Sequence, residues 1–384
     1  MKNRPRVALL IETSNSYARG LLRGIHAFIR EHESWSTYLP ELARGEAPPA
    51  WLNQNWQGDG IIARIENRRI AQVVKQSGLP VINVSSSQLV SEIPSVVTKG
   101  EAVARLAVEH LSGRGLEHFG FCGDNRFRWS LLRGKQFEQI VKERGFSCDL
   151  YGTQKLARSQ PSWDKEEKQL AAWLKKLPKP AGVMACHDLR GLQVLQVCRR
   201  VEIAVPDEIA VLGVDNDEIL CSLSTPPMSS VAQDTYRIGY EAARLLEQWM
   251  AGKRPQQGME IDPLGIVTRQ SSDGFAVNDP LVSRAMQFIR DHACDGINVD
   301  QILEVVPLSR RMLEHRFKKL LGRTPHDEIL KLQFERAKQL LTETSLPLST
   351  IAERVGFRHA EYLSVAFKRR FGSPPGEYRN DHRR

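Results

Sequence analysis

Short apolar runs alternate with amphipathic stretches over the first 270 residues of the chain. The runs are continuous rather than interrupted by polar residues, which is typical of strands covered on both faces of a sheet. They predict strands over residues 6–11, 60–63, 80–84, 118–122, 182–185 and 209–214. The stretches between them repeat apolar residues at helical spacing. They predict helices over residues 20–30, 68–77, 100–112, 131–144, 165–176 and 190–200.

This alternation of strands and helices predicts parallel sheets built from βαβ units. We expect two α/β lobes in series, with the divide near residues 111–116 and a return near residues 230–236. Ligands of open α/β sheets bind at the carboxyl ends of the strands. Two facing lobes therefore predict a cleft that holds a small molecule.

The pattern changes near residue 270. The segment TRQSSDGFAVNDP, residues 268–280, is polar and rich in turn-forming residues, which is typical of an interdomain linker. Asp279 followed by Pro280 is a helix-start signal, and the pattern after it is wholly helical. We therefore predict a two-lobed domain over residues 1–270, a linker over 271–280 and an all-α domain over 281–384.

The all-α part contains an internal repeat with an offset of 50 residues, since FKKLLGRTP from Phe317 matches FKRRFGSPP from Phe367. Each copy reads as a helix, a tight turn and a second helix. The predicted helices cover 299–306 and 309–321 in the first copy, and 349–355 and 359–371 in the second. Serines and glycines at their ends are candidate caps. They are Ser309, Ser349, Gly322 and Gly372.

Rows of leucine and phenylalanine on the second helix of each copy predict the side that faces the core. The opposite sides carry basic and hydrogen-bonding residues, which is typical of a helix that enters the major groove of DNA. Arg pairs with guanine edges, and Ser or His can reach bases or phosphates. The candidate DNA-binding residues are Ser309, Arg310, Arg311, Glu314, His315 and Lys318 in the first copy, and Arg358, His359, Glu361, Ser364 and Lys368 in the second.

These faces could instead be the solvated side of an ordinary helical bundle. The duplication favours DNA binding, because residues 327–341 carry an apolar stripe that can hold both copies rigidly. Two readers held in this way could enter successive major grooves, about 34 Å apart. Charge supports this interpretation, since residues 277–384 hold 19 Lys+Arg and 14 Asp+Glu and contribute +5 of the chain's +9. Such a basic module favours a polyanion as partner.

The remaining motifs exclude several classes of protein. The six cysteines form no CxxC pair and lie at no zinc-finger spacing to histidine, so we expect free thiols, a cytoplasmic location and no metal site. The apolar run over residues 7–11 is too short for a signal peptide or a membrane span. No dinucleotide-binding glycine pattern, Walker loop, HExxH motif or nucleophile elbow is present. We expect neither an enzyme nor a bound cofactor.

The C-terminal part resembles the AraC-type DNA-binding domain over roughly residues 280–380. RAKQLL from Arg336, Ile351-Ala352, Gly356-Phe357, Tyr362, Phe367-Lys368, Gly372, Pro375 and Tyr378-Arg379 stand at the family's spacings. The resemblance implies a seven-helix domain with two helix-turn-helix units whose outer faces contact bases. Pro307 departs from the family pattern, because a small residue is common in that first turn.

The first 270 residues resemble the sugar-binding core of LacI-type regulators and periplasmic sugar-binding proteins. GDGII from Gly58, GLPV from Gly78, LSGRG from Leu111, GVDN from Gly213 and SVAQ from Ser230 carry the resemblance. Joined to an AraC-type domain, this part is similar to the family of xylose-operon regulators. That likeness implies a sugar-responsive activator, with xylose as the expected effector, that forms a homodimer, binds a double-stranded DNA operator and recruits RNA polymerase.

Sugar chemistry is consistent with the polar residues that the resemblance brings to the cleft. Carboxylates and amides bind hydroxyls, arginine donates from a planar fork, and an aromatic ring covers the C–H side of a sugar. Asp188 and Asp215 could instead cap the helices that follow them, and Trp129 could pack in the core. The candidate sugar-binding residues are Tyr17, Arg19, Arg128, Trp129, Arg133, His187, Asp188, Asp215 and Gln233.

Three positions depart from the pattern of the sugar-binding family. His187 stands where Asn is common, Lys99 where Asp is common, and residues 85–87 read SSS where an Asp-Arg pair is common. Two alternatives therefore stay open. The chain could respond to another sugar, or it could be a DNA-architectural protein whose α/β part only dimerises.

Overall fold

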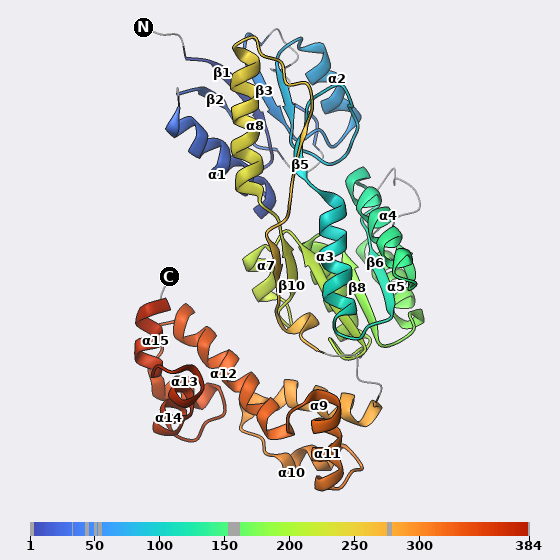
Figure 1. Ribbon diagram of the computed structural model, residues 1–384, viewed down its shortest axis with the longest axis vertical. Coiled ribbons are helices and arrows are strands. Elements are labelled where there is room, and N and C mark those ends of the chain that lie inside the picture. The colour runs from blue at the N-terminus through green and yellow to red at the C-terminus, as the bar shows by residue number, and fades with distance from the viewer. Residues whose placement is uncertain are drawn as a thin grey trace. The chain divides into compact units, whose positions relative to one another are not determined.

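The computed structural model describes residues 4–32, 34–42, 46–49, 52, 56–152, 162–274 and 279–382 (Figure 1). The chain divides into two compact units, Met1–Gly274 and Phe275–Arg384. Strands and helices alternate in the first unit, and the described part of the second is helical. The predicted fold class, a two-lobed α/β part followed by an all-α part, is what the chain adopts.

The first lobe of the N-terminal unit is built on a parallel sheet with the strand order β2-β1-β3-β4. Alternate residues of β1 enter different cores, since Val7 and Leu9 pack with α1 and α8, whereas Ala8 and Leu10 pack with α2. Both faces of the sheet are therefore covered, as its continuous apolar strands predict. The elements are β1 (Arg6–Leu10), α1 (Ser16–Glu31), β2 (Ser36–Tyr38), β3 (Gly60–Ala63), α2 (Arg68–Gln76), β4 (Val81–Asn83) and α8 (Thr235–Met250).

Helices α1 and α8 lie side by side on this sheet, although they come from opposite ends of the unit (Figure 1). Glycines make the close approach possible. A Cβ atom on Gly24 would lie 1.9 Å from the carbonyl oxygen of Tyr236. Because any side chain there would meet backbone rather than a movable side chain, the spacing of the two helices depends on this glycine.

The second lobe contains a six-stranded sheet with the order β12-β10-β9-β8-β6-β7. Its strands are parallel except that β12 runs antiparallel to β10. Helices α3 to α7 belong to this lobe (Figure 1). The elements are α3 (Gly100–Ser112), β6 (His118–Cys122), α4 (Arg128–Glu143), β7 (Ser147–Tyr151), α5 (Trp163–Lys176), β8 (Ala181–Ala185), α6 (Asp188–Arg200), β9 (Ile209–Val214), α7 (Glu218–Leu223), β10 (Ser229–Ala232) and β12 (Gly265–Val267).

The chain crosses between the lobes at three places. It passes from β5 (Val96–Thr98) to α3, from β10 to α8, and from β11 (Met259–Ile261) to β12. Strands β5 and β11 pair with each other in parallel, so two of the crossings run together. The predicted return near residues 230–236 is correct. The predicted divide at 111–116 is wrong, because α3 packs on the second lobe and the first crossing lies before Gly100.

The predicted strands and helices of this unit all occur, with ends shifted by a few residues. Helices α7 and α8 and the short strands β2, β5, β7, β10, β11 and β12 were not predicted. The compact unit also extends past the predicted boundary at 270, since Ser271 and Ser272 are fully buried in it. Residues 275–278 of the predicted linker lie outside the described residues.

The C-terminal unit has two small cores bridged by one long helix, α12. Its described residues form seven α-helices, the number that the family resemblance implies. Asp279 caps the first of them, as predicted, by accepting from the amides of Leu281 and Val282. The helices are α9 (Pro280–His292), α10 (Val299–Val305), α11 (Arg310–Leu321), α12 (Pro325–Glu343), α13 (Leu348–Arg354), α14 (Ala360–Phe371) and α15 (Pro375–His382).

Three of the four predicted caps of the repeat are correct. Ser309 accepts from the amide of Met312 at the start of α11, and α11 and α14 end at Gly322 and Gly372 in the left-handed conformation. The fourth, Ser349, is wrong as a cap because it lies inside α13, whose N-cap is Pro347.

Candidate effector pocket and DNA-binding surface

A pocket lies where the carboxyl ends of the strands of both lobes meet. The first lobe contributes residues that follow β1, β3 and β4, and the second contributes residues from α4 and from the end of β9. Gln233 comes from the crossing between β10 and α8. The space that water can reach is only about 30 Å³, room for one or two water molecules. The lining residues are Tyr17, Arg64, Ser85, Ser86, Trp129, Arg133, Asp215 and Gln233.

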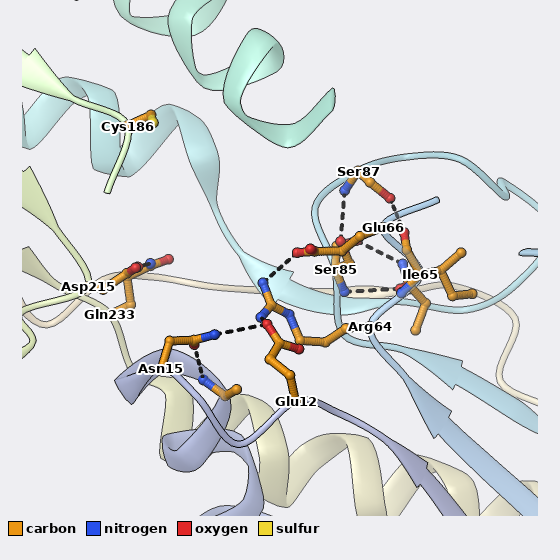
Figure 2. A network of polar contacts seen from close by, with 12 residues as sticks. Glu12, Asn15, Arg64, Ile65, Glu66, Ser85, Ser87, Cys186, Asp215 and Gln233 are labelled. Carbon is orange, nitrogen blue, oxygen red and sulfur yellow. Dashed lines mark hydrogen bonds and ion pairs between the residues drawn. The ribbon is translucent and has the colours of Figure 1, made fainter. Parts of the chain in front are cut away.

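Arg64 is the most strongly held charge in this pocket. It directly follows β3, is 6% exposed, and forms ion pairs with Glu12 and, at 2.6 Å, with Glu66 (Figure 2). Burial acts to lower the pKa of its guanidinium, but the two carboxylates outweigh burial and raise it. Its Cζ atom also lies 5.0 Å from the centre of the Tyr17 ring. Arg64 is therefore a permanent cation held beside an aromatic ring.

Neighbouring groups fix the carboxylate of Glu12 in its turn. The Asn15 side chain donates to it at 2.9 Å, while the side-chain oxygen Oδ1 of Asn15 caps α1 by accepting from the Ala18 amide at 2.9 Å (Figure 2). The start of α1 and the end of β3 are thus joined through Glu12. This arrangement preorganises Arg64 without support from the second lobe.

A buried asparagine shapes the loop that carries Ser85 and Ser86. Asn83 accepts from the amides of Ile65 and Ser85 at 3.2 and 3.0 Å, and donates to the Ser85 carbonyl at 2.8 Å. The Ser87 hydroxyl donates to the carbonyl of Ile65 (Figure 2). The loop is therefore rigid and holds small hydroxyl side chains where the sugar-binding family often has an Asp-Arg pair.

The second lobe places Arg133 and Trp129 on the same helix, α4. The guanidinium of Arg133 donates to the carbonyl of Cys186 at the end of β8, and its Cζ lies 5.3 Å from the centre of the Trp129 ring. Trp129 is 7% exposed and its ring is also 5.8 Å from that of His187. One cation and one flat apolar surface thus line this side of the pocket.

Asp215 follows β9 in an unusual backbone conformation with φ +109°. Non-glycine residues seldom adopt a positive φ, and such strain tends to occur at functional sites. The Gln233 side chain donates to the Asp215 carboxylate, and Gln233 is 6% exposed. Its Oε1 accepts no hydrogen bond from the described residues. This buried acceptor can serve a ligand hydroxyl.

The outer faces of α11 and α14 form the candidate DNA-binding surface. Arg311, His315 and Lys318 are exposed on α11, and Glu314 is half-buried. Arg310 is paired with Glu314 at 3.2 Å and with Asp300 at 3.1 Å.

The corresponding face of α14 and the turn before it is exposed at most of the predicted positions, and Ser364 is half-buried. Two apolar residues that the sequence interpretation did not include lie among them, Tyr362 at 72% and Val365 at 70% exposure. The exposed predicted residues are Arg358, His359, Glu361 and Lys368.

Comparison with known proteins finds related domains along most of the chain. Residues 6–98 match a family described as the XylR N-terminal domain, 108–272 a periplasmic binding protein-like domain, and 302–381 a helix-turn-helix domain. The xylose operon regulatory protein of Escherichia coli K12 is 33% identical over 98% of this chain and 97% of its own length. That of Haemophilus influenzae is also 33% identical, over 97% and 98%.

The chain belongs to the family of xylose operon regulatory proteins. A solved structure described as the xylose-binding transcription activator XylR covers all of this chain, with 32% identity and a TM-score of 0.85. A solved structure of the transcriptional regulator CelR in complex with cellobiose covers 71% of this chain and 86% of its own, at 19% identity and a TM-score of 0.57, which shows a shared fold. Members of the family are transcription regulators, which confirms that the chain is not an enzyme.

Five of the nine predicted sugar-binding residues line the pocket: Tyr17, Trp129, Arg133, Asp215 and Gln233. The other four form contacts elsewhere. Arg19 donates to the carbonyl of Thr13 at 3.0 Å, and Arg128 donates from the second lobe to the carbonyl of Ser87 in the first at 2.9 Å.

His187 and Asp188 are engaged at the start of α6. His187 caps the helix by accepting from the amide of Arg190 at 3.2 Å. Asp188 is 1% exposed and accepts from the Asp217 amide and the Ser230 hydroxyl, each at 2.6 Å. The alternative prediction that Asp188 and Asp215 cap the helices after them is wrong, because the N-caps of α6 and α7 are His187 and Asp217. The contacts of Asp188 instead join the start of α6 to the loop after β9 and to β10.

Arg64, Ser85 and Ser86 are the pocket residues that the sequence interpretation did not select. Arg64 stands directly after a predicted strand, and that position was the available signal. In the part of the chain that the structure describes, no helix is long and apolar enough to span a membrane. All six cysteines carry free thiols.

Proposed function

We propose that this chain is a xylose-responsive transcription regulator that takes the sugar into the pocket between its lobes. The observation that carries the proposal is the convergence of two cations, a carboxylate, an amide and two aromatic rings from both lobes at one point. The names of the full-length relatives support xylose as the effector, and periplasmic-binding-protein-like domains with other sugars support the class of ligand.

Each lining group suits one part of a pentose. Arg64 and Arg133 donate to hydroxyl oxygens, and the Asp215 carboxylate accepts from hydroxyl hydrogens. Gln233 accepts through its buried Oε1. The rings of Trp129 and Tyr17 offer apolar faces to the C–H side of the sugar. The remaining predicted ligands do not line the pocket, so they would contact the sugar only if the lobes rearrange. They are Arg19, Arg128, His187 and Asp188.

Sugar binding would be coupled to movement of the lobes. The pocket volume of about 30 Å³ is too small for a pentose, so the lobes open, or lining side chains move, to admit it. The hydrogen bond from Arg128 to the Ser87 carbonyl joins the lobes directly and would form in the closed state. A sugar that binds the closed state better shifts the equilibrium toward it by its difference in affinity.

The output of this movement is proposed to be activation of a promoter. Two chains form a homodimer, and closure changes how the pair presents its helix-turn-helix units to tandem half-sites. The bound dimer recruits RNA polymerase in the cytoplasm. Residues 1–270 sense, 281–384 bind DNA, and the linker between them transmits the change.

Calorimetry with D-xylose and its epimers D-ribose, D-lyxose and L-arabinose tests the sugar assignment. We expect D-xylose to bind with the highest affinity, and Arg133→Ala to weaken it by at least tenfold. Arg105→Ala is the matched control, because Arg105 is an exposed arginine of the same lobe that pairs with Glu101. Equal affinities for all four sugars would reject xylose specificity, and no binding of any sugar would favour the architectural alternative.

Footprinting on promoter DNA with and without the bound sugar tests regulation. Arg358→Ala is expected to weaken binding by roughly 1–3 kcal/mol if Arg358 pairs with a base. Identical footprints at every sugar concentration would show that the sugar does not act through DNA occupancy.

A further inference from the structure

Helices α11 and α14 expose matching positions to solvent. With the offset of 50 residues, the burial pattern from 311 to 320 is identical to that from 361 to 370. Leu313 and Phe317 are buried in one helix, and Leu363 and Phe367 in the other. Equivalent positions on the two outer faces can therefore be compared directly.

The two helices differ in chemistry at several of these positions, and two of the differences place exposed apolar side chains on α14. Position 312 on α11 is a methionine, 45% exposed, and position 315 is an exposed histidine. The equivalents on α14 are Tyr362 at 72% and Val365 at 70% exposure. An exposed valine contributes less to helix stability than alanine or a long polar residue would.

Tyr362 and Val365 share one side of α14, because residues three apart on a helix are neighbours. The Tyr362 ring lies 6.3 Å from that of Phe357, centre to centre, which limits its freedom. Lys368, Arg369 and Arg370 are exposed in the last two turns of the same helix. An apolar pair beside three cations matches the major groove, where thymine methyl groups lie between the phosphate backbones.

We propose that α14 reads thymine, with Val365 and Tyr362 packed against C5-methyl groups of the operator. α11 reads its half of the site by polar pairing instead, through Arg311 and His315, since Arg310 is held by Glu314 and Asp300. The two halves of one binding site therefore differ in composition, and the half under α14 contains a required thymine. This proposal rests on the proposed function in that the outer faces bind DNA.

Replacing deoxythymidine with deoxyuridine tests the contact, because it removes only the methyl group. The full chain selects duplexes from a random pool, and the preferred duplex is made again with one such replacement at a time. Burial of one methyl group is worth about 0.8 kcal/mol, which corresponds to a fourfold change in affinity. We expect wild type to lose about fourfold at a thymine in one half of the site.

Val365→Ala should bind the unmodified duplex more weakly and lose nothing further when that thymine is replaced. Met312→Ala, which shortens the exposed apolar residue of α11 at the position equivalent to Tyr362, is the matched control and should keep the fourfold loss. Far-ultraviolet circular dichroism confirms that each variant is folded. A deoxyuridine loss of equal size in wild type and Val365→Ala overturns the proposal, as does a selected site with no sensitive thymine.

The variants Arg311→Ala and Arg358→Ala separate this proposal from the function on which it rests. If Arg311→Ala, Arg358→Ala and Val365→Ala all bind every duplex with wild-type affinity, the outer faces do not bind DNA and the proposed function fails. If the two arginine variants weaken binding while Val365→Ala does not, DNA binding stands. The apolar pair then faces a protein partner instead, and thymine reading is rejected.

Discussion

Asp188 offers a direct test of whether a buried carboxylate in the sensing unit binds ligand or maintains structure. It is 1% exposed, and its two oxygens accept from the Asp217 amide and the Ser230 hydroxyl at 2.6 Å each. Alanine would leave both donors buried without an acceptor. Each such loss costs roughly 1–3 kcal/mol, so we expect Asp188→Ala to lower the free energy of unfolding of this unit by about 3 kcal/mol.

Asparagine at the same position should be far less disruptive. Burial, together with the negative charge of Asp215, raises the pKa of Asp188 well above its usual range, so the site favours an uncharged group. The amide oxygen of asparagine can still accept from the Asp217 amide, and the Ser230 hydroxyl can rotate to accept from its nitrogen. We expect Asp188→Asn to cost about 1 kcal/mol.

Tryptophan fluorescence reports this unit alone, because all seven tryptophans of the chain lie before residue 275. For a unit of this size, 3 kcal/mol corresponds to a fall in Tm of about 6–10 °C. Asp164→Ala, an exposed acid in the first turn of α5, is the matched control and should shift Tm by less than about 3 °C. The reasoning would be refuted if Asp188→Ala melted like wild type while losing all sugar binding.

Three further changes are expected to have measurable effects. Burial and the neighbouring Arg114 lower the pKa of the His110 imidazole to about 4. In the unfolded chain the same imidazole binds a proton near pH 6.5. The free energy of unfolding should therefore fall between pH 6.5 and 4, by at most about 2–3 kcal/mol. His110→Gln should flatten that fall in fluorescence-monitored urea titrations, and an unchanged slope would contradict the assignment. Gly24→Ala places a Cβ 1.9 Å from the Tyr236 carbonyl oxygen and should lower the free energy of unfolding by about 2–3 kcal/mol, measured in the same way. Phe367→Ala removes a fully buried ring and should cost about 3–5 kcal/mol in the C-terminal unit, with DNA binding lost in a mobility-shift assay and the heat of sugar binding unchanged.

Local pattern was sufficient for most of the secondary structure. A continuous apolar run such as that of β9 can be stable only when both faces of a sheet are covered, so its sequence predicts both the strand and the surroundings. The repeat in the C-terminal unit is predicted for a similar reason. Buried Phe317 and Phe367 recur with the same neighbours at a fixed offset, and two copies of a helix-turn-helix pattern exclude most other helical arrangements.

The sequence pattern did not determine which elements pack together across long separations. Helix α3 was assigned to the wrong lobe because its apolar stripe does not specify which of the two sheets it packs on. Helix α8 was missed, and its place against α1 depends on glycines such as Gly24 that have no periodic signature. Two of the three crossings run together because β5 pairs with β11, a contact between distant segments.

The candidate pocket shows the same division between local and long-range determinants. Asp188 and Asp215 both follow apolar strands, so the sequence predicted both as sugar ligands and did not distinguish between them. The folded second lobe turns Asp188 inward to the Asp217 amide, whereas a positive φ directs Asp215 into the pocket beside Gln233. Arg64 joined the site only because Glu12 and Glu66 hold it there. Periodicity encodes each element through its nearest neighbours, but the direction of a polar side chain depends on hydrogen bonds to residues far away in the chain.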